Sequence, residues 1–404
     1  MHSQPDLRAK DHSDLRVAIV HYWLLNRRGG ERVVEALCHL FPQADIFTLL
    51  CEPGALSPTL QNHKLTTSFL QKLPGSRRWH RHLLPLMPLA LEQFDLRGYD
   101  LVISSESGPA KGVITGSSTC HICYCHTPMR YAWDFYHEYK NRSGLGRFKK
   151  AAFAVTTHYA RLWDRASADR VDYFASNSHN VARRIHKVYR RDAEVIYPPV
   201  DMSQSYLSGE ADNYYLMVGQ LVSYKRVDLA IEACERLDRP LRIVGVGEEY
   251  KRLKRLAGKN ITFLSGLTDG EVREQYARCR ALLFPGEEDF GIVPVEAQSF
   301  GKPVIGFGKG GIRETVIAVD SETTPPELAT GAFLEEQSVD ALCNAIDEFE
   351  RWESRFSPEF IRSHSQRFAT QAFMEQMSDF IDRCMAEFRS LQETPAKKKV
   401  SAAV

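Results

Sequence analysis

The sequence predicts an α/β protein of two domains, each built on a parallel sheet covered by helices. With 404 residues, the chain is long enough for two domains of ordinary size. Short apolar runs alternate with helical patterns in both halves, which is typical of parallel sheets. Two consecutive prolines in Ile196–Asp201 make a stiff extended connector, so we expect the halves to meet near Pro198.

Composition excludes several classes of protein. The formal net charge is +1, so no overall field favours nucleic acid, and we expect no nucleic-acid partner. Residues 1–14 are polar and lack the apolar core of a signal peptide. No apolar run approaches the roughly 18 residues that span a bilayer. The nine cysteines are scattered through apolar segments, which predicts reduced thiols and a cytoplasmic protein.

The first half contains five apolar runs that we interpret as buried strands. These are Val17–His21, Ala44–Leu50, Leu101–Ser104, Ile122–Cys125 and Tyr173–Ser176. A loop with Gly29 and Gly30 precedes a helical pattern over Glu31–Leu40. The CHICYCH segment, Cys120–His126, raises the alternative of a metal site, but alternation along a strand puts its four candidate ligands on opposite faces. We therefore predict a buried strand and no metal.

The second half shows the same rhythm more clearly. The predicted strands are Tyr215–Val218, Leu241–Val244, Ile261–Leu264, Ala281–Phe284 and Pro303–Gly306. The predicted helices are Val227–Leu237, Glu248–Leu256, Asp269–Cys279, Val295–Phe300 and Ile312–Ile317, followed by Ser338–Glu350 and Phe368–Leu391. This order indicates a doubly wound sheet, whose ligand crevice lies beyond the carboxyl ends of the strands.

One stretch of the first half, Phe69–Phe94, mixes three arginines with Trp79 and several leucines. Arginine and tryptophan beside an apolar face are typical of a segment that lies in a membrane interface. The alternative is a pair of core helices with a basic edge. Pro85 and Pro88 break any long amphipathic helix in either case.

The strongest chemical pattern runs from Phe284 to Val316. A strand end leads into an acidic loop, a tight turn at Phe290–Gly291 and a helix that we expect to begin near Val293. A helix N-terminus behind a glycine loop favours phosphate. Glu288 precedes this N-terminus and Glu296 is expected in the first turn, where carboxylates suit sugar and ribose hydroxyls.

This segment closely resembles the family-four retaining glycosyltransferases of GT-B architecture, whose signature is two glutamates separated by seven residues. Ten positions match, namely Glu288, Asp289, Phe290, Gly291, Glu296, Ala297, Gly301, Pro303, Val304 and Ile305. The resemblance implies that Glu288 contacts hydroxyls of the transferred sugar and Glu296 the ribose. It also implies that the backbone at Phe290, Gly291, Ile292 and Val293 meets the sugar and the diphosphate.

Two further segments of the second half match family loops. In Val218–Ala233 the resemblance implies that Lys225 contacts the diphosphate, and the neighbouring Arg226 is a candidate to compensate for a family arginine that this sequence lacks. The family arginine is replaced here by Gln220, which is a departure. Gly245 and Gly247 match a loop near the base, and Gly310 and Gly311 match one near the sugar phosphate.

In the first half, the resemblance places the loop with Gly29 and Gly30 beside the donor phosphates and the acceptor. It implies that His126, at the end of a predicted strand, contacts the donor sugar. Arg130 and Asp134 are candidates for facing the acceptor. Taken with Lys225 and Glu288, His126 completes the predicted catalytic set.

The resemblance covers about residues 16–390 and implies two Rossmann-like domains facing each other across a cleft. We expect an acceptor-side domain over 15–197 and a nucleotide-sugar domain over 205–365. A C-terminal helix over 366–391 is expected to cross back to the first domain, ahead of a disordered tail over 392–404.

The function implied is retaining transfer of a hexose from a nucleotide sugar, without cofactor or metal. The YKRVD and HTPMRYAWD wording resembles the mannosyltransferase branch, with GDP-mannose as donor and a glycan or lipid-linked glycan as acceptor. The expected location is the cytoplasm, with peripheral membrane contact through residues 69–94. The alternatives are a UDP-sugar-dependent transferase for glucose or GlcNAc, a GT-B epimerase, or a non-catalytic nucleotide-sugar-binding protein.

Overall fold

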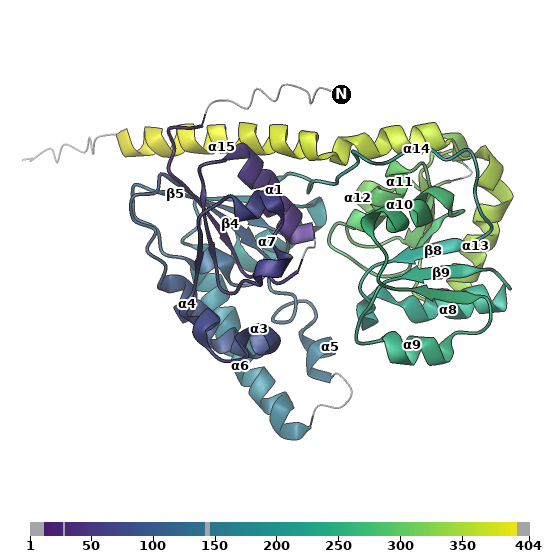
Figure 1. Cartoon of the computed structure of the whole chain (residues 1–404), viewed down its shortest axis with the longest axis horizontal. Helices are drawn as coiled ribbons and strands as arrows, with labels where there is room; N and C mark the ends of the chain where they lie inside the picture. Colours follow the sequence, from purple (N-terminus) through teal and green to yellow (C-terminus); the bar gives the residue numbers. More distant parts are fainter. Residues whose placement is uncertain (1–11, 27–28, 142–145, 321, 394–404) are drawn as a thin grey trace, which may run out of the picture. The chain divides into compact units, whose positions relative to one another are not determined.

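The computed structural model describes residues 12–26, 29–141, 146–320 and 322–393. The chain divides into two compact units. The first runs to Asn177, resumes over Val181–Ile196 and includes the chain from Met374. The second comprises Ser178–Asn180 and Tyr197–Phe373. Two parallel-strand sheets, one in each unit, confirm the predicted two-domain α/β fold (Figure 1).

The first unit holds a seven-stranded parallel sheet in the order β3-β2-β1-β4-β5-β6-β7. Its strands are β1 Val17–His21, β2 Asp45–Thr48, β3 Leu65–Thr67, β4 Leu101–Glu106, β5 Cys120–Cys125, β6 Tyr173–Ser176 and β7 Glu194–Val195. The five predicted strands are all present. The two edge strands, β3 and β7, were not predicted, because each is very short and lacks a fully buried apolar run.

Helices connect these strands. They are α1 Gly29–Leu40, α2 Pro58–Gln61, α3 Ser76–Trp79, α4 Met87–Glu92, α5 Tyr136–Asn141, α6 Arg147–Ala168 and α7 His179–Tyr189, with 3-10 turns η1 Pro53–Ala55, η2 Phe69–Lys72, η3 His80–Leu86 and η4 Ala110–Gly112. The stretch 69–94 is a run of short turns in which no long helix forms, as Pro85 and Pro88 predict.

The second unit holds a six-stranded parallel sheet in the order β10-β9-β8-β11-β12-β13. Its strands are β8 Tyr215–Val218, β9 Leu241–Val244, β10 Ile261–Leu264, β11 Leu282–Phe284, β12 Val304–Phe307 and β13 Gly331–Leu334. Its helices are α8 Val227–Arg236, α9 Tyr250–Leu256, α10 Asp269–Arg278, α11 Ile292–Ser299, α12 Ile312–Thr315, α13 Val339–Trp352 and α14 Pro358–Ser365, with turns η5 Ser223–Lys225, η6 Pro326–Leu328, η7 Glu353–Arg355 and η8 Gln366–Phe368.

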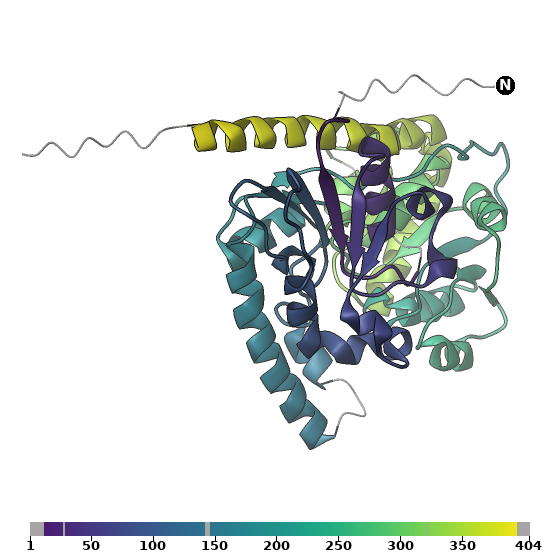
Figure 2. The same ribbon diagram turned by 60° about the vertical axis from the view of Figure 1, so that its left-hand side comes forward.

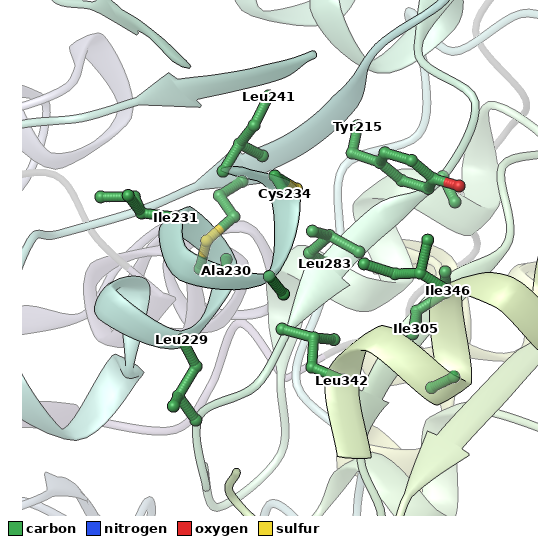
Figure 3. Packing of buried hydrophobic residues seen from close by; sticks show 14 of the residues in the cluster. Tyr215, Leu229, Ala230, Ile231, Cys234, Leu241, Leu283, Ile305, Leu342 and Ile346 are labelled. Atoms are coloured by element: carbon green, nitrogen blue, oxygen red, sulfur yellow. The ribbon is translucent and has the colours of Figure 1, made fainter. Parts of the chain in front are cut away.

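Alternate residues of the second sheet enter two separate cores. Tyr215 and Met217 pack with α8 and α13 on one face, as Figure 3 shows for Tyr215, Ile231 and Ile346. Leu216 lies on the other face with residues of α10, α11 and α12. Helices therefore cover both faces, which is the doubly wound arrangement. Each fully buried Leu or Ile contributes about 1.5–3 kcal/mol relative to exposure.

The C-terminal helix α15, Thr370–Glu393, groups with the first unit from Met374 onward. Arg383 pairs with Glu194 at 2.6 Å, and Gln392 donates a hydrogen bond to the Ser117 carbonyl at 2.8 Å. Met377 and Ile381, two residues of this helix, are fully buried. The tail that was expected to be disordered lies almost entirely outside the described residues.

Candidate active site

The carboxyl ends of two paired strands of the second unit bring Lys225 and Glu288 together. Strand β8 leads through η5 to Lys225, and β11, its neighbour in the sheet, leads into the loop that carries Glu288. Lys225 Nζ lies 2.7 Å from Glu288 Oε1, and the two side chains are only 16% and 19% exposed. This is a largely buried ion pair at the edge where doubly wound sheets bind ligands.

The pair keeps Lys225 charged. Burial by itself lowers the pKa of this ammonium group, but Glu288, Tyr224 and Glu296 together raise the pKa above its usual value. A permanent cation in a largely buried position is suited to an anionic ligand, because low surrounding polarity strengthens the attraction.

Glycines hold the backbone against this lysine. Gly219 has φ of 141°, and a Cβ placed on it would lie 2.8 Å from Lys225 Nζ. A Cβ on Gly286 would lie 2.7 Å from Lys225 Cα. The loops after β8 and β11 therefore approach closely because Gly286 lacks a side chain, and Gly219 leaves room for the lysine ammonium within the loop after β8.

Helix α11 begins directly behind Glu288. Its N-cap is Gly291, in the left-handed conformation with φ of 91°, so no side chain caps the first amides, those of Ile292 and Val293. Phe290 is buried and packs against Phe368 with ring centroids 5.5 Å apart. The aromatic ring therefore anchors the turn, and the helix N-terminus behind it is suited to phosphate.

Glu296 is the fifth residue of α11, so the prediction that it lies in the first turn was wrong. The helix begins at Ile292, because the left-handed Gly291 ends the loop there. The Tyr276 hydroxyl donates a hydrogen bond to Glu296 Oε2 at 2.9 Å, which fixes the carboxylate.

Close backbone packing accounts for Gly245 and Gly247. A Cβ on Gly245 would lie 1.9 Å from the Gly219 carbonyl oxygen, and one on Gly247 would lie 2.2 Å from that of Leu221. Both glycines are required for the loop after β9 to pack against the loop after β8. The predicted contact of this loop with a nucleotide base stays a prediction.

Gly310 and Gly311 fix the backbone of Glu288 in a similar way. Gly310 forms an isolated bridge with Glu288, and the Gly311 amide donates to the Glu288 carbonyl at 2.9 Å. A Cβ on Gly310 would lie 2.4 Å from that same carbonyl oxygen. The loop after β12 thus positions the proposed sugar-binding carboxylate.

Arg226 has a local partner. It is the N-cap of α8 with φ of 50°, and its Nε lies 3.3 Å from Asp228 Oδ1. The guanidinium is thus engaged by the first turn of its own helix, and its role as a second cation for the diphosphate stays a prediction. Gln220, which takes that arginine's place, is half-buried just after β8.

In the first unit, His126 directly follows β5, as predicted. Its Nε2 lies 2.9 Å from Ser105 Oγ on β4. A Cβ on Gly30 would lie 3.8 Å from the same Nε2. Gly29 and Gly30 are the first two residues of α1, so placing them in a loop was wrong by two residues. The helix N-terminus itself therefore lies beside His126.

His21, the last residue of β1, was missed by sequence reasoning. It is fully buried, and its Cε1 would lie 3.4 Å from a Cβ on Gly30. Among the described residues, no group has hydrogen-bonding geometry with either ring nitrogen. Burial and the neighbouring His126 lower its pKa to about 3, which the Ser105 backbone only partly opposes. Its position at the end of a predicted buried strand was the sequence signal that could have identified it as a candidate site residue.

Arg130 and Asp134 both have structural partners. The Arg130 guanidinium lies over the Phe135 ring, 5.3 Å from its centroid, and Asp134 pairs with Arg184 at 2.6 Å. Their predicted contact with an acceptor stays a prediction.

Within the CHICYCH segment, Cys120–Cys125 form strand β5 and are buried throughout, with Cys123 and Cys125 in one core cluster. Within the described ranges, no group of three or more His, Cys, Asp or Glu side chains is arranged to hold a metal ion. Over the same residues, no helix combines the length and apolar character needed to cross a membrane.

Comparison with known proteins gives this arrangement a context. A family model described as Glycosyl transferases group 1 matches residues 201–365, and one described as Glycosyltransferase Family 4 matches residues 27–204. The alpha-1,3/1,6-mannosyltransferase ALG2 of Saccharomyces cerevisiae is 24% identical over 87% of this chain and 82% of its own.

Two other relatives match over shorter stretches. The O-antigen chain mannosyltransferase RfbU of Salmonella typhimurium is 29% identical over 36% of this chain and 45% of its own. The uncharacterized glycosyltransferase MJ1178 of Methanocaldococcus jannaschii is 32% identical over 35% of this chain and 41% of its own. The alignments thus span less than half the length of these two relatives.

Solved structures share the fold. Anabaena HepE, crystallised with UDP and glucose, has a TM-score of 0.66 at 15% identity, over 91% of this chain and 99% of its own. The lipopolysaccharide outer core galactosyltransferase WaaB has a TM-score of 0.61 at 17% identity, over 91% and 99%.

Proposed function

Because the chain belongs to the family-four glycosyltransferases of GT-B architecture, we propose that it transfers mannose from GDP-mannose to a glycan hydroxyl with retention of configuration. The single observation that carries the proposal is the Lys225–Glu288 pair beside the N-terminus of α11. The mannosyltransferases among its relatives support the choice of sugar.

The reaction breaks the bond between the anomeric carbon and the diphosphate oxygen. Lys225 and the amides of Ile292 and Val293 stabilise the negative charge that develops on the leaving diphosphate. The acceptor oxygen attacks the face from which the diphosphate departs, and the acceptor proton passes to the departing phosphate oxygen. No protein nucleophile, metal ion or cofactor is needed, since the lysine cation and the helix dipole provide the positive charge.

The carboxylates position the donor. Glu288 accepts hydrogen bonds from hydroxyls of the sugar, and Glu296 accepts them from the ribose. In the first unit, His126 contacts the sugar, and the backbone at Gly29 and Gly30 approaches the phosphates. These contacts orient the reacting atoms, which is a large part of the catalysis available without covalent chemistry.

The acceptor in this proposal is a lipid-linked glycan used in polysaccharide assembly, held at the cytoplasmic face of a membrane. The relative named for O-antigen chain synthesis supports a glycan acceptor. Residues 69–94, with Arg77, Arg78, Arg81 and Trp79 exposed, supply the predicted membrane contact.

The proposal is tested by incubating the full chain with radiolabelled GDP-mannose or UDP-glucose, a bacterial lipid extract and EDTA. We expect label from GDP-mannose to enter the lipid fraction, with an α-linkage by NMR. Transfer from UDP-glucose but not from GDP-mannose would show that the proposed donor is wrong. A β-linkage in the product would exclude retention of configuration. A requirement for added metal would exclude the metal-free mechanism.

A further inference from the structure

Helix α6 exposes several large apolar side chains on the face opposite to its buried residues. Its buried residues are Thr157, Asp164, Ser167 and Ala168. On the opposite face, Phe148, Val155, Tyr159 and Leu162 are between 57% and 93% exposed. A surface helix of a globular protein normally buries its apolar stripe and exposes its polar face. In α6, polar side chains such as Asp164 are buried, whereas large apolar side chains such as Phe148 are exposed.

The exposed side chains form one continuous stripe, which we call the α6 stripe. It consists of Phe148, Ala152, Val155, Tyr159, Leu162 and Ala166, all exposed. The spacing of three and four residues places them in line along the helix, over five turns. Isolated exposed apolar residues are ordinary, but a contiguous row of this length marks an interaction surface.

Polar contacts hold the inner face of α6 firmly, so the stripe is not exposed by fraying. Asp164 forms a fully buried ion pair with Lys111 and accepts a hydrogen bond from Trp133 Nε1 at 2.7 Å. Arg161 donates to the Ala132 carbonyl at 2.9 Å, and Trp163 Nε1 donates to Glu92 at 3.1 Å.

The stripe continues into the segment 69–91 through a cavity. This cavity of about 210 Å³ is lined by Leu84, Pro88, Tyr159 and Trp163, so it lies between η3–α4 and α6. Tyr159 belongs to both the cavity and the stripe. Trp79, Leu86 and Leu89 extend the exposed apolar surface on the other side. Both ribbon views place α6 alongside these short helices (Figure 2).

Charge identifies the partner. Residues 69–91 carry Lys72, Arg77, Arg78 and Arg81, and residues 147–160 carry Arg147, Lys149 and Lys150, with no acidic residue in either segment. Of these, Arg77 pairs with Glu52 at 2.9 Å. The chain as a whole has a formal charge of only +1, so the positive charge is concentrated here. Basic residues beside exposed apolar side chains complement the anionic headgroups and hydrocarbon of a bilayer.

We propose that the α6 stripe and the segment 69–91 form one docking surface for an anionic lipid bilayer, in which α6 lies in the interface and the cavity receives part of a lipid hydrocarbon chain. The inference deepens the proposed function, since a lipid-linked acceptor lies in such a membrane. It places the main apolar contact on α6, outside the stretch 69–94 that the sequence indicates.

The test is flotation of the full chain with two kinds of vesicle, phosphatidylcholine alone or phosphatidylcholine with phosphatidylglycerol, without donor. We expect binding to the anionic vesicles at least tenfold stronger than to the neutral ones. A variant carrying Phe148→Ser, Val155→Ser and Leu162→Ser should lose at least tenfold of that binding. A matched control, with Leu256→Ser, Leu328→Ser and Leu391→Ser at other exposed positions, should bind as the wild type does.

A second variant separates the contribution of the basic residues to membrane binding from the contribution of the apolar stripe. Arg147→Gln, Lys149→Gln and Lys150→Gln together should abolish most of the preference for anionic vesicles, because each basic residue near such a surface contributes roughly fivefold to binding. Calorimetric GDP binding and the melting temperature show that each variant is folded, and they report on donor binding separately from the membrane.

Several outcomes would overturn the inference. Wild-type protein that floats with neither vesicle, or a stripe variant that floats as well as wild type, excludes α6 as the contact. A wild-type dimer in light scattering that the stripe variant converts to a monomer, with vesicle binding unchanged, would assign the stripe to a second copy of the chain.

Discussion

Lys225 Nζ lies 2.7 Å from Glu288 Oε1, and this ion pair joins the loop after β8 to the loop after β11. Gly286 permits this approach, because a side chain there would collide with the Lys225 backbone. Gly310 permits the loop after β12 to pack against the Glu288 carbonyl. The ion pair thus has two consequences. It holds the proposed donor site together, and it keeps a cation and a hydrogen-bond acceptor side by side at the ends of the two strands.

Replacing the positive charge of Lys225 should strongly reduce the turnover rate. We expect Lys225→Met to reduce kcat by about 10²–10³-fold, the loss typical for one group that stabilises a developing oxyanion. The measurement is mannose transfer at saturating GDP-mannose. Lys251→Met, at an exposed position on α9, is the matched control and should leave kcat unchanged. Equal turnover in the two variants would remove Lys225 from the mechanism.

At Glu296, the proposed contact with the ribose can be separated from the observed hydrogen bond with Tyr276. Glu296→Gln should weaken GDP binding by about tenfold or more, because a hydrogen bond to a charged group contributes about 1.5–3 kcal/mol. Tyr276→Phe removes only the partner at 2.9 Å and should change the Kd by less than threefold. If the tyrosine variant binds as weakly as the glutamine variant, the carboxylate serves to hold α10 against α11.

The packing of the C-terminal part of α6 depends on the buried ion pair between Asp164 and Lys111. Asp164→Ala leaves Lys111 buried without its carboxylate, so we expect the free energy of unfolding to fall by about 3–5 kcal/mol. Urea unfolding measures this. Asp169→Ala, at the exposed end of the same helix, should cost less than about 0.5 kcal/mol. A loss of less than 1 kcal/mol for Asp164→Ala would show that the pair is replaceable by solvent.

Acid should destabilise the first unit through His21. Its pKa is about 3 when folded and 6.5 in the unfolded chain, so the unfolded state binds a proton first as the pH falls. The contribution of neutral His21 to the free energy of unfolding is therefore fully present above pH 6.5. It is lost as the pH falls from about 6.5 to 3, by up to about 1.4 kcal/mol per pH unit. His121, whose pKa is lowered to about 4 chiefly by burial, adds a similar loss.

Urea unfolding at pH 7.5 and 5.0 measures this dependence. His21→Gln should show a shallower fall than wild type, with the His121 contribution remaining. A fall of equal size in both proteins would mean that His21 has a solvated, ordinary titration.

The second sheet was predictable because its strands are buried on both faces and read as uninterrupted apolar runs. Three of its predicted strands have the observed bounds, and Ala281–Phe284 and Pro303–Gly306 differ by one residue at one or both ends. Strand β13 was not predicted, because Gly331–Leu334 is a single short run with no distinct flanking pattern.

The arrangement of the candidate site was harder to predict from the sequence than the strands were. Glu288 and Lys225 were found through their motif, but their ion pair joins loops far apart in sequence and could not be predicted. His21 is one histidine in an apolar run, and only the fold reveals that it borders Gly30. Helix α6 was not singled out, because periodicity is read on the assumption that apolar residues face the core. Phe148, Val155 and Leu162 of this helix face outward instead.

The most direct test of the proposed function is isothermal titration calorimetry in EDTA with GDP, UDP, GDP-mannose and UDP-glucose, on wild type and Lys225→Met. We predict that wild type binds GDP and GDP-mannose selectively and that Lys225→Met binds both at least tenfold more weakly. At about 100 times its Kd, GDP should also stabilise the wild type by roughly 2.7 kcal/mol. Selective binding of the uridine ligands, or GDP binding that Lys225→Met leaves unchanged, would contradict the account.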